Sequence, residues 1–147
     1  MVRRRIISVA LLVASLSWLV QFSAAQNVET FKARLSPVPI NIAMMATIAG
    51  SGSLSATLRG NQLTIEGTFE GLRSPATTAQ IHRSPKGIPG PVVPGFELTV
   101  TKAVRGSISG TIELSPDQIS DLRKGLWYVQ IQSERAPDGN LWGWLLR

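Results

Sequence analysis

The run Leu-Ser-Ala-Thr-Leu-Arg-Gly-Asn-Gln-Leu-Thr-Ile-Glu-Gly-Thr-Phe, residues 54–69, decides the fold. Apolar side chains recur at every second position before Gly60-Asn61, and the same alternation returns after it. A period of two is that of a strand with one buried face, and a Gly-Asn pair between two such runs is a turn signal. Gly67, inside the second run, predicts a bulge or a close approach of another backbone. The stretch therefore predicts an antiparallel β-hairpin.

Shorter alternating runs occupy much of the remaining chain. We expect further strands over residues 31–35, 78–82, 96–100, 108–114, 127–133 and 141–145. The run Pro137-Asp138-Gly139-Asn140 predicts a turn before the last strand. Residues 85–95 hold too many prolines and glycines for a central strand, so we expect an ordered surface loop there. Short strands at this spacing, without a long amphipathic helix, predict an all-β, antiparallel Ig-like β-sandwich.

One short helix is expected between the strands. Ser115 is a good N-cap, Pro116 follows at the first helical position, and Gln118 completes a capping box. Ile119 and Leu122 form its apolar stripe, and Gly125 is a residue suited to ending a helix in the left-handed conformation. We expect this helix to pack over one end of the sheets.

The first residues are typical of an export signal rather than of the fold. Arg3, Arg4 and Arg5 precede the apolar run of residues 6–20, and the small residues Ser23 and Ala25 mark a cleavage site. We therefore expect residues 1–25 to be a signal peptide and residues 26–147 to form one domain. An uncleaved anchor is the alternative, but the apolar run is shorter than the ~20 residues of a membrane-spanning helix.

Composition limits the cellular compartment and the classes of partner that are expected for this chain. Fifteen Lys and Arg stand against nine Asp and Glu, and loss of three arginines with the signal lowers the net charge from +6 to +3. No basic cluster with interleaved aromatics occurs, so we expect no nucleic-acid partner. The chain has no cysteine, and no disulfide is available to it. These features favour a bacterial periplasmic or secreted protein, with no transmembrane segment after signal cleavage.

Alternation also predicts which side chains share a face. Gln80 and His82 face one way along their strand, as do Tyr128, Gln130 and Gln132 along another, and Trp142 and Trp144 along the last. If the last two strands pair, these residues form an aromatic and amide binding surface suited to a sugar or a partner protein. The alternative is that the rings cover the second sheet inside the sandwich. We assign Trp127 to the core.

The runs TAQIH (residues 78–82), GIPGPVV (87–93), SGTIEL (109–114), DLRKG (121–125), YVQIQS (128–133) and PDGNLWGWL (137–145) occur in this order. That series resembles the CHRD (chordin) domain family, in a bacterial-type exported single-domain form. The resemblance implies a sandwich similar to that of copper-zinc superoxide dismutase, with an H-x-H pair in the first run and a further His in the fifth. Here these positions are Gln80, His82 and Gln132. Amide oxygens are poor ligands for zinc or copper, so we expect no metal site, His82 being its only candidate ligand.

Catalysis has little support in the sequence. His82 is the only imidazole base, no G-x-S-x-G run occurs, and Asp117 with Asp121 reads as a solvated helix face rather than an acid–base couple. No nucleotide-binding glycine pattern occurs, so we expect no cofactor. The sequence favours a non-catalytic binding or structural module of the cell envelope or extracellular space, with an unknown protein or polysaccharide partner. The alternative is a metal-binding protein or superoxide-dismutase-like metalloenzyme with a degenerate His site.

Overall fold

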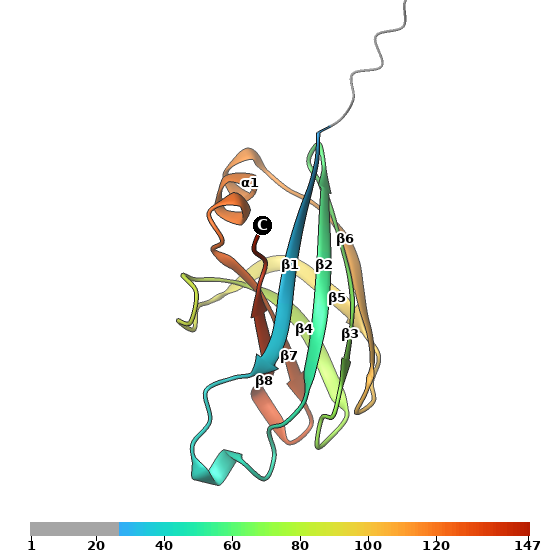
Figure 1. Ribbon diagram of the computed structural model, residues 1–147, viewed down its shortest axis with the longest axis vertical. Coiled ribbons are helices and arrows are strands. Elements are labelled where there is room, and N and C mark those ends of the chain that lie inside the picture. The colour runs from blue at the N-terminus through green and yellow to red at the C-terminus, as the bar shows by residue number, and fades with distance from the viewer. Residues whose placement is uncertain (1–26) are drawn as a thin grey trace, which may run out of the picture.

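The computed structural model describes residues 27–147, which form eight strands and one α-helix (Figure 1). The elements are β1 (Val28–Pro37), β2 (Ser51–Arg59), β3 (Gln62–Glu70), β4 (Ala76–Arg83), β5 (Val92–Val100), β6 (Gly106–Glu113), α1 (Pro116–Arg123), β7 (Trp127–Ser133) and β8 (Ala136–Trp144). A 3₁₀ turn, η1 (Ile42–Met44), lies in the β1–β2 loop. The all-β class with one short helix is confirmed. The predicted signal peptide, residues 1–25, lies outside the described residues.

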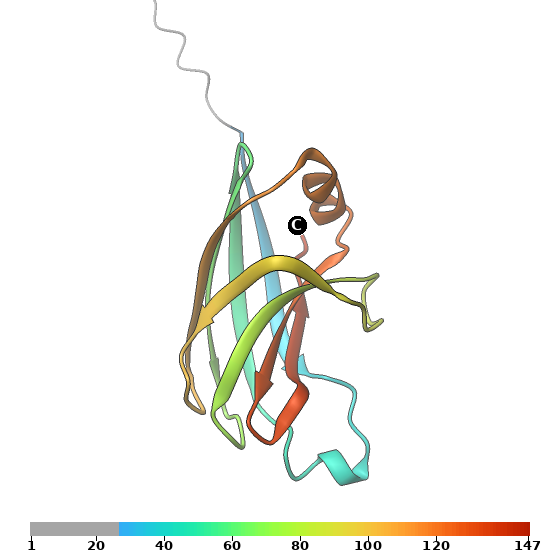
Figure 2. The same cartoon turned by 180° about the vertical axis from the view of Figure 1, so that it is seen from behind.

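The strands close into a barrel in the order β1-β2-β3-β6-β5-β4-β7-β8. All neighbouring pairs are antiparallel, and β1 and β5 each belong to two sheets. We term β1, β2, β3, β6 and the end of β5 sheet A. Sheet B consists of β4, β7, β8, the beginning of β5 and the end of β1. Figure 2 shows β5 crossing from one wall of the barrel to the other.

Closure corrects the predicted Ig-like or superoxide-dismutase-like sandwich. On one side, β1 runs on to Pro37, so Ser36 pairs with Trp142 and Pro37 with Leu141 of β8. On the other side, β5 pairs first with β4 and then, through Thr99 and Val100, with β6. Because an alternating run has the same appearance in an open sheet and in a barrel, the sequence pattern does not distinguish the two. Closure pairs the strand edges that a sandwich leaves free.

One apolar cluster fills the barrel, as expected for eight strands, whose interior is just wide enough for side chains. Strands of both sheets contribute to it, and Phe31, Ile65 and Trp127 are each at most 1 % exposed. The core position predicted for Trp127 is thereby confirmed. Gly67 also behaves as predicted, since a Cβ there would lie 2.2 Å from the carbonyl oxygen of Ser53. The reason is close backbone approach, because the β2–β3 register has no shift.

Two predicted loop boundaries are wrong. The expected surface loop over residues 85–95 ends at Pro91, and β5 begins at Val92, which pairs with His82. The register shift before Glu97 sets residues 93–96 of β5 opposite Ile81 alone, and this irregularity accommodates Pro94 and Gly95 within the strand. The predicted turn at residues 137–140 belongs to β8, and the chain turns at Glu134 and Arg135 instead. Asn140 is fully buried and donates from Nδ2 to Oγ of Ser133 at 2.8 Å, which holds this segment in the sheet.

The helix forms as its capping residues predict. Oγ of Ser115 accepts from the amide of Gln118 at 3.2 Å, and the side chain of Gln118 accepts from the amide of Ser115 at 2.9 Å. Gly125 follows the helix with a φ of +71°. α1 lies at one end of the barrel, as predicted, and Leu122 anchors it in the core (Figure 1).

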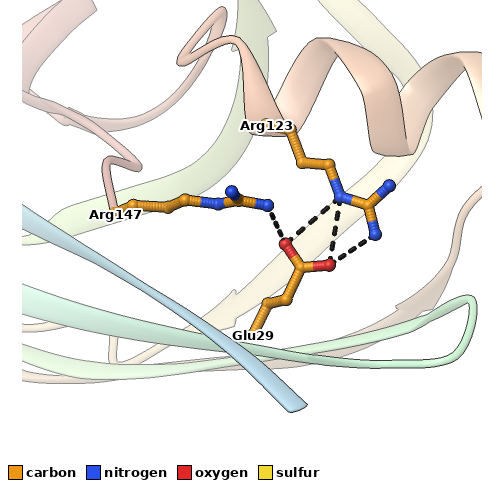
Figure 3. A network of polar contacts seen from close by, with 3 residues as sticks. All are labelled: Glu29, Arg123 and Arg147. Atoms are coloured by element: carbon orange, nitrogen blue, oxygen red, sulfur yellow. Dashed lines mark hydrogen bonds and ion pairs between the residues drawn. The ribbon is translucent and has the colours of Figure 1, made fainter. Parts of the chain in front are cut away.

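Glu29 of β1 joins the beginning of the barrel to α1 and to the C-terminus (Figure 3). Its carboxylate accepts from Nε of Arg123 at 3.0 and 3.2 Å, and from Nη2 of both Arg123 and Arg147. The hydrogen bond from Arg123 is the main reason that the pKa of Glu29 lies below its ordinary value. Desolvation opposes it as the next largest effect, and the hydrogen bond from Arg147 and the charges of both arginines lower the pKa further. The folded protein therefore favours the ionised carboxylate.

Glu29→Gln should lower the free energy of unfolding near neutral pH by about 1 kcal/mol or less, because both arginines are largely exposed. A depressed folded-state pKa stabilises the protein above the unfolded-state pKa, and this contribution is lost as pH falls through the folded-state value. Urea unfolding at a series of pH values should therefore show the two proteins converging in acid. Glu66→Gln, on the exposed outer side of β3, is the matched control and should show no such convergence. A difference for Glu29→Gln that does not change with pH would contradict this role.

Candidate functional site

The outer face of sheet B brings together the residues predicted as a binding surface. These are Gln80, His82, Tyr128, Gln130, Gln132, Trp142 and Trp144. β7 lies between β4 and β8, so the register aligns His82, Tyr128 and Trp144 in one cross-strand row. The next row is Gln80, Gln130 and Trp142. The predicted pairing of the last two strands is therefore confirmed.

This layer is covered, although it lies outside the barrel. His82 is 7 % exposed, Tyr128 1 %, and Trp142 9 %, while Gln80 is half-buried. The β4–β5 loop (residues 84–91) and the β1–β2 loop (residues 38–50) supply the cover. Both expected placements of the rings are thus corrected: they form no open surface, and they do not point between two sheets. The reason is that loops, not a second sheet, bury this face.

Gly90 is the point at which the β4–β5 loop is fixed to the sheet. Its amide donates to the Tyr128 hydroxyl at 2.9 Å, and that hydroxyl lies 3.2 Å from the Gly90 carbonyl oxygen. Nδ1 of His82 also lies 2.9 Å from the same carbonyl. A Cβ at residue 90 would lie 2.1 Å from the carbonyl oxygen of Arg83, so only glycine fits without a shift. We term this arrangement the Gly90 clamp.

An aromatic stack continues from the clamp across the sheet. The His82 ring stacks on Tyr128 with centroids 5.0 Å apart, and Tyr128 lies 4.4 Å from Trp144. Trp142 meets Trp144 edge-on at 4.7 Å. The indole N–H of Trp144 donates to the carbonyl oxygen of Ser84 at 2.9 Å, a second attachment of the loop. Such pairs add about 0.5–1.5 kcal/mol each beyond burial, so the stack makes the layer rigid.

The amide side chains complete the layer through hydrogen bonds. Thr78 donates to Oε1 of Gln132 at 2.7 Å, and Nε2 of Gln132 donates to Oε1 of Gln80 at 3.1 Å. Nε2 of Gln130 donates to the carbonyl oxygen of Asp138 at 3.1 Å. These partners satisfy polar groups that would be costly to bury alone.

The carboxylates singled out in the sequence have no part in this layer. Asp121 forms an ion pair with Arg83, 2.6 Å from Nε, and the hydrogen bond from Arg83 lowers the pKa of Asp121. The pair joins α1 to β4 and keeps Asp121 ionised, so Asp121 is a structural group rather than a proton donor.

Residues 27–147 contain no helix long and apolar enough to cross a membrane.

The CHRD domain family model matches residues 31–145, nearly all of the barrel. The chain belongs to the CHRD domain family. The search of curated proteins gave no match, and the search of solved structures gave none. The resemblance to the CHRD domain family is thereby confirmed, while the bacterial-type, exported form of it stays a prediction.

The register of this CHRD domain separates the three positions of the H-x-H pattern. Gln80 and Gln132 are hydrogen-bonded neighbours, but Gln132 pairs near Thr78 whereas His82 pairs with Tyr128. The two rows are offset by four positions along the strand, or about 13 Å. Ligands of one zinc ion each lie about 2 Å from it, so side chains at positions 82 and 132 do not share an ion in this fold. Within residues 27–147, no three His, Cys, Asp or Glu side chains form a group that could hold a metal.

His82 retains one unpaired ring atom. A carbonyl oxygen only accepts, so in the neutral imidazole Nδ1 carries the proton given to Gly90. Nε2 is then left with its lone pair, and it has no hydrogen-bond partner among the described residues. Nε2 of His82 is therefore the atom of this layer that could act as a metal ligand.

Sequence reasoning missed the cover and the pockets beside it. One pocket of about 330 Å³ lies between the β4–β5 loop and β1, and another of about 210 Å³ lies between the two loops. Trp142 lines both. The signal that could have revealed the cover is the run Trp127–Ser133, which has no charged residue on either face and is buried throughout.

Tyr128→Phe should destabilise the fold by about 1–3 kcal/mol, because the hydroxyl is buried and the Gly90 amide loses its acceptor. The midpoint of urea unfolding measures this loss. The released loop should also become sensitive to trypsin at Lys86. The matched control is Thr64→Val, which removes a hydroxyl on the outer face of sheet A and should change stability by less than about 0.5 kcal/mol. Equal midpoints and equal cleavage for all three proteins would contradict the clamp.

Proposed function

We propose that this CHRD domain is an exported, non-catalytic binding module of the cell envelope or extracellular space, with a protein or polysaccharide partner. Three observations support the proposal. The family is typically extracellular, and the sequence begins with a signal-like segment. In addition, the side chains of His82, Tyr128 and Trp144 hold the β4–β5 loop in place.

The observation that carries the proposal is that His82 is buried beneath the β4–β5 loop. A general base needs an unoccupied nitrogen within hydrogen-bond reach of a substrate proton. His82 has such a nitrogen, Nε2, but that atom is buried. The ring is 7 % exposed, stacked on Tyr128 and bonded through Nδ1 to Gly90, so a substrate would have to displace the loop to reach Nε2. The layer is built as rigid support for the surface around it.

A metal-binding role is the second candidate, and Nε2 of His82 is the observation that favours it. One imidazole alone gives weak affinity, and the neighbouring side chains are amides and aromatic rings. Any site would have to recruit water or backbone oxygen as its remaining ligands. We rank this role below the binding module for that reason.

Export gives the first test. The chain expressed from Met1 should appear outside the cytoplasm with Gln26 as its first residue, as measured by mass spectrometry of the periplasmic and medium fractions. The processed protein should also co-sediment with an insoluble envelope preparation from the producing cells. A chain that keeps Met1 and stays in the cytoplasm would overturn the proposal.

Metal content separates the two candidates. The exported protein and its His82→Ala variant should both contain substoichiometric zinc and copper by elemental analysis, because only one imidazole is present. One ion per chain that disappears in the variant would instead support the metal-binding role. A variant that unfolds is replaced by His82→Gln, which keeps a side chain able to donate to Gly90.

A further inference from the structure

Three adjoining depressions form one track across the outside of the barrel. The first, of about 330 Å³, lies beside Trp144 and Lys86, and the next two, of about 580 and 710 Å³, follow the outer face of sheet A. Arg34 lines all three, so they are contiguous. We term this track the cross-barrel groove.

Strand register makes the floor of the groove. Arg34 pairs with Ser53, Ser53 with Thr68, and Thr68 with Ser107, so these residues form a row perpendicular to the strands. Neighbouring strands are about 4.8 Å apart, and the row therefore runs about 15 Å. All four side chains lie on exposed positions. An elongated ligand laid across the strands would meet hydroxyl groups along the whole row.

Positive charge gathers at one end of the groove. Lys32, Arg34 and Lys86 line the first depression, and none of its lining residues is acidic. The ion pairs found within residues 27–147 use Arg83, Arg123 and Arg147, so none of these three cations is neutralised by a partner carboxylate. Glu66 and Glu70 line the other two depressions, so the excess of positive charge belongs to the first depression. Unpaired cations there favour an anionic group of the ligand at that end.

We propose that the cross-barrel groove binds a linear polysaccharide that carries carboxylate groups. This inference rests on the proposed binding function and names its partner. Lys32, Arg34 and Lys86 pair with carboxylates, and Arg34 offers the fork that a carboxylate fits. Ser53, Thr68 and Ser107 both donate and accept, which suits sugar hydroxyls.

Other polymers fit the groove less well. The described strands close into a barrel with no edge strand, so an acidic peptide cannot bind by adding a strand. Trp142 and Trp144 are 9 % and 7 % exposed, so their faces do not offer the stacking platforms that single-stranded nucleic acids use. Sugar hydroxyls need no such platform, because the exposed hydroxyls of Ser53, Thr68 and Ser107 can pair with them.

Binding of the exported chain to polygalacturonate, measured by calorimetry at about 0.15 M salt where long-range attraction is screened, tests the inference. Lys32→Gln/Arg34→Gln should weaken binding about tenfold or more, as expected for lost charge-assisted hydrogen bonds. The matched control is Arg59→Gln/Lys102→Gln, which removes the same charge away from the groove and should bind as the parent does. Equal weakening in both variants would show unspecific attraction and overturn the inference.

A second pair of measurements tests the hydroxyl row. Ser53→Ala/Thr68→Ala should weaken polygalacturonate binding several-fold while leaving net charge unchanged, and dextran should not bind at all. Polyglutamate that binds as tightly as polygalacturonate would identify an acidic-peptide site and overturn the saccharide assignment. Failure of the parent chain to bind polygalacturonate overturns this inference alone if the chain still co-sediments with the envelope. Failure of both measurements overturns the proposed function as well.

Discussion

Burial of β7 on both faces is the constraint on which the rest of the structure depends. All seven residues of this strand are buried, so sheet B needs a cover on each side. Inside, the apolar cluster of the barrel supplies it. The outer face carries aromatic rings and amides. The loop that covers it must bury the rings and also provide hydrogen-bond partners for the polar groups. The Gly90 clamp does so, because the Gly90 peptide exchanges hydrogen bonds with Tyr128 and meets His82 within 3.2 Å.

The same constraint explains why His82, the only imidazole of the chain, is poorly placed to act on a substrate. The family resemblance directs attention to positions 80, 82 and 132, yet the register sets 82 and 132 in rows about 13 Å apart along the strand. Gln80 and Gln132 are hydrogen-bonded to each other, whereas His82 holds the β4–β5 loop through Gly90 and stacks on Tyr128. Surface chemistry lies elsewhere, on the exposed faces of β1, β2 and β3, where cations and hydroxyls are free to meet a partner.

Local pattern predicted the elements well, because each depends on near neighbours in the chain. The Gly60-Asn61 hairpin, the Ser115 capping box and the shared face of Tyr128, Gln130 and Gln132 all follow from spacing alone. Barrel closure was not predictable in this way, since it depends on how far β1 continues and on where β5 changes partners. The cover over the aromatic layer was missed for the same reason: the contact of Gly90 with Tyr128 joins residues 38 positions apart.

Hydrogen exchange at the Gly90 amide tests the clamp most directly, by NMR or by mass spectrometry of the peptide that contains residues 84–91. The account predicts that this amide exchanges slowly, with protection close to that of the β7 amides, because its proton is given to the buried Tyr128 hydroxyl. Gly87, in the same loop and on its exposed side, provides the internal reference for fast exchange. A Gly90 amide that exchanges as fast as that of Gly87 would contradict the account.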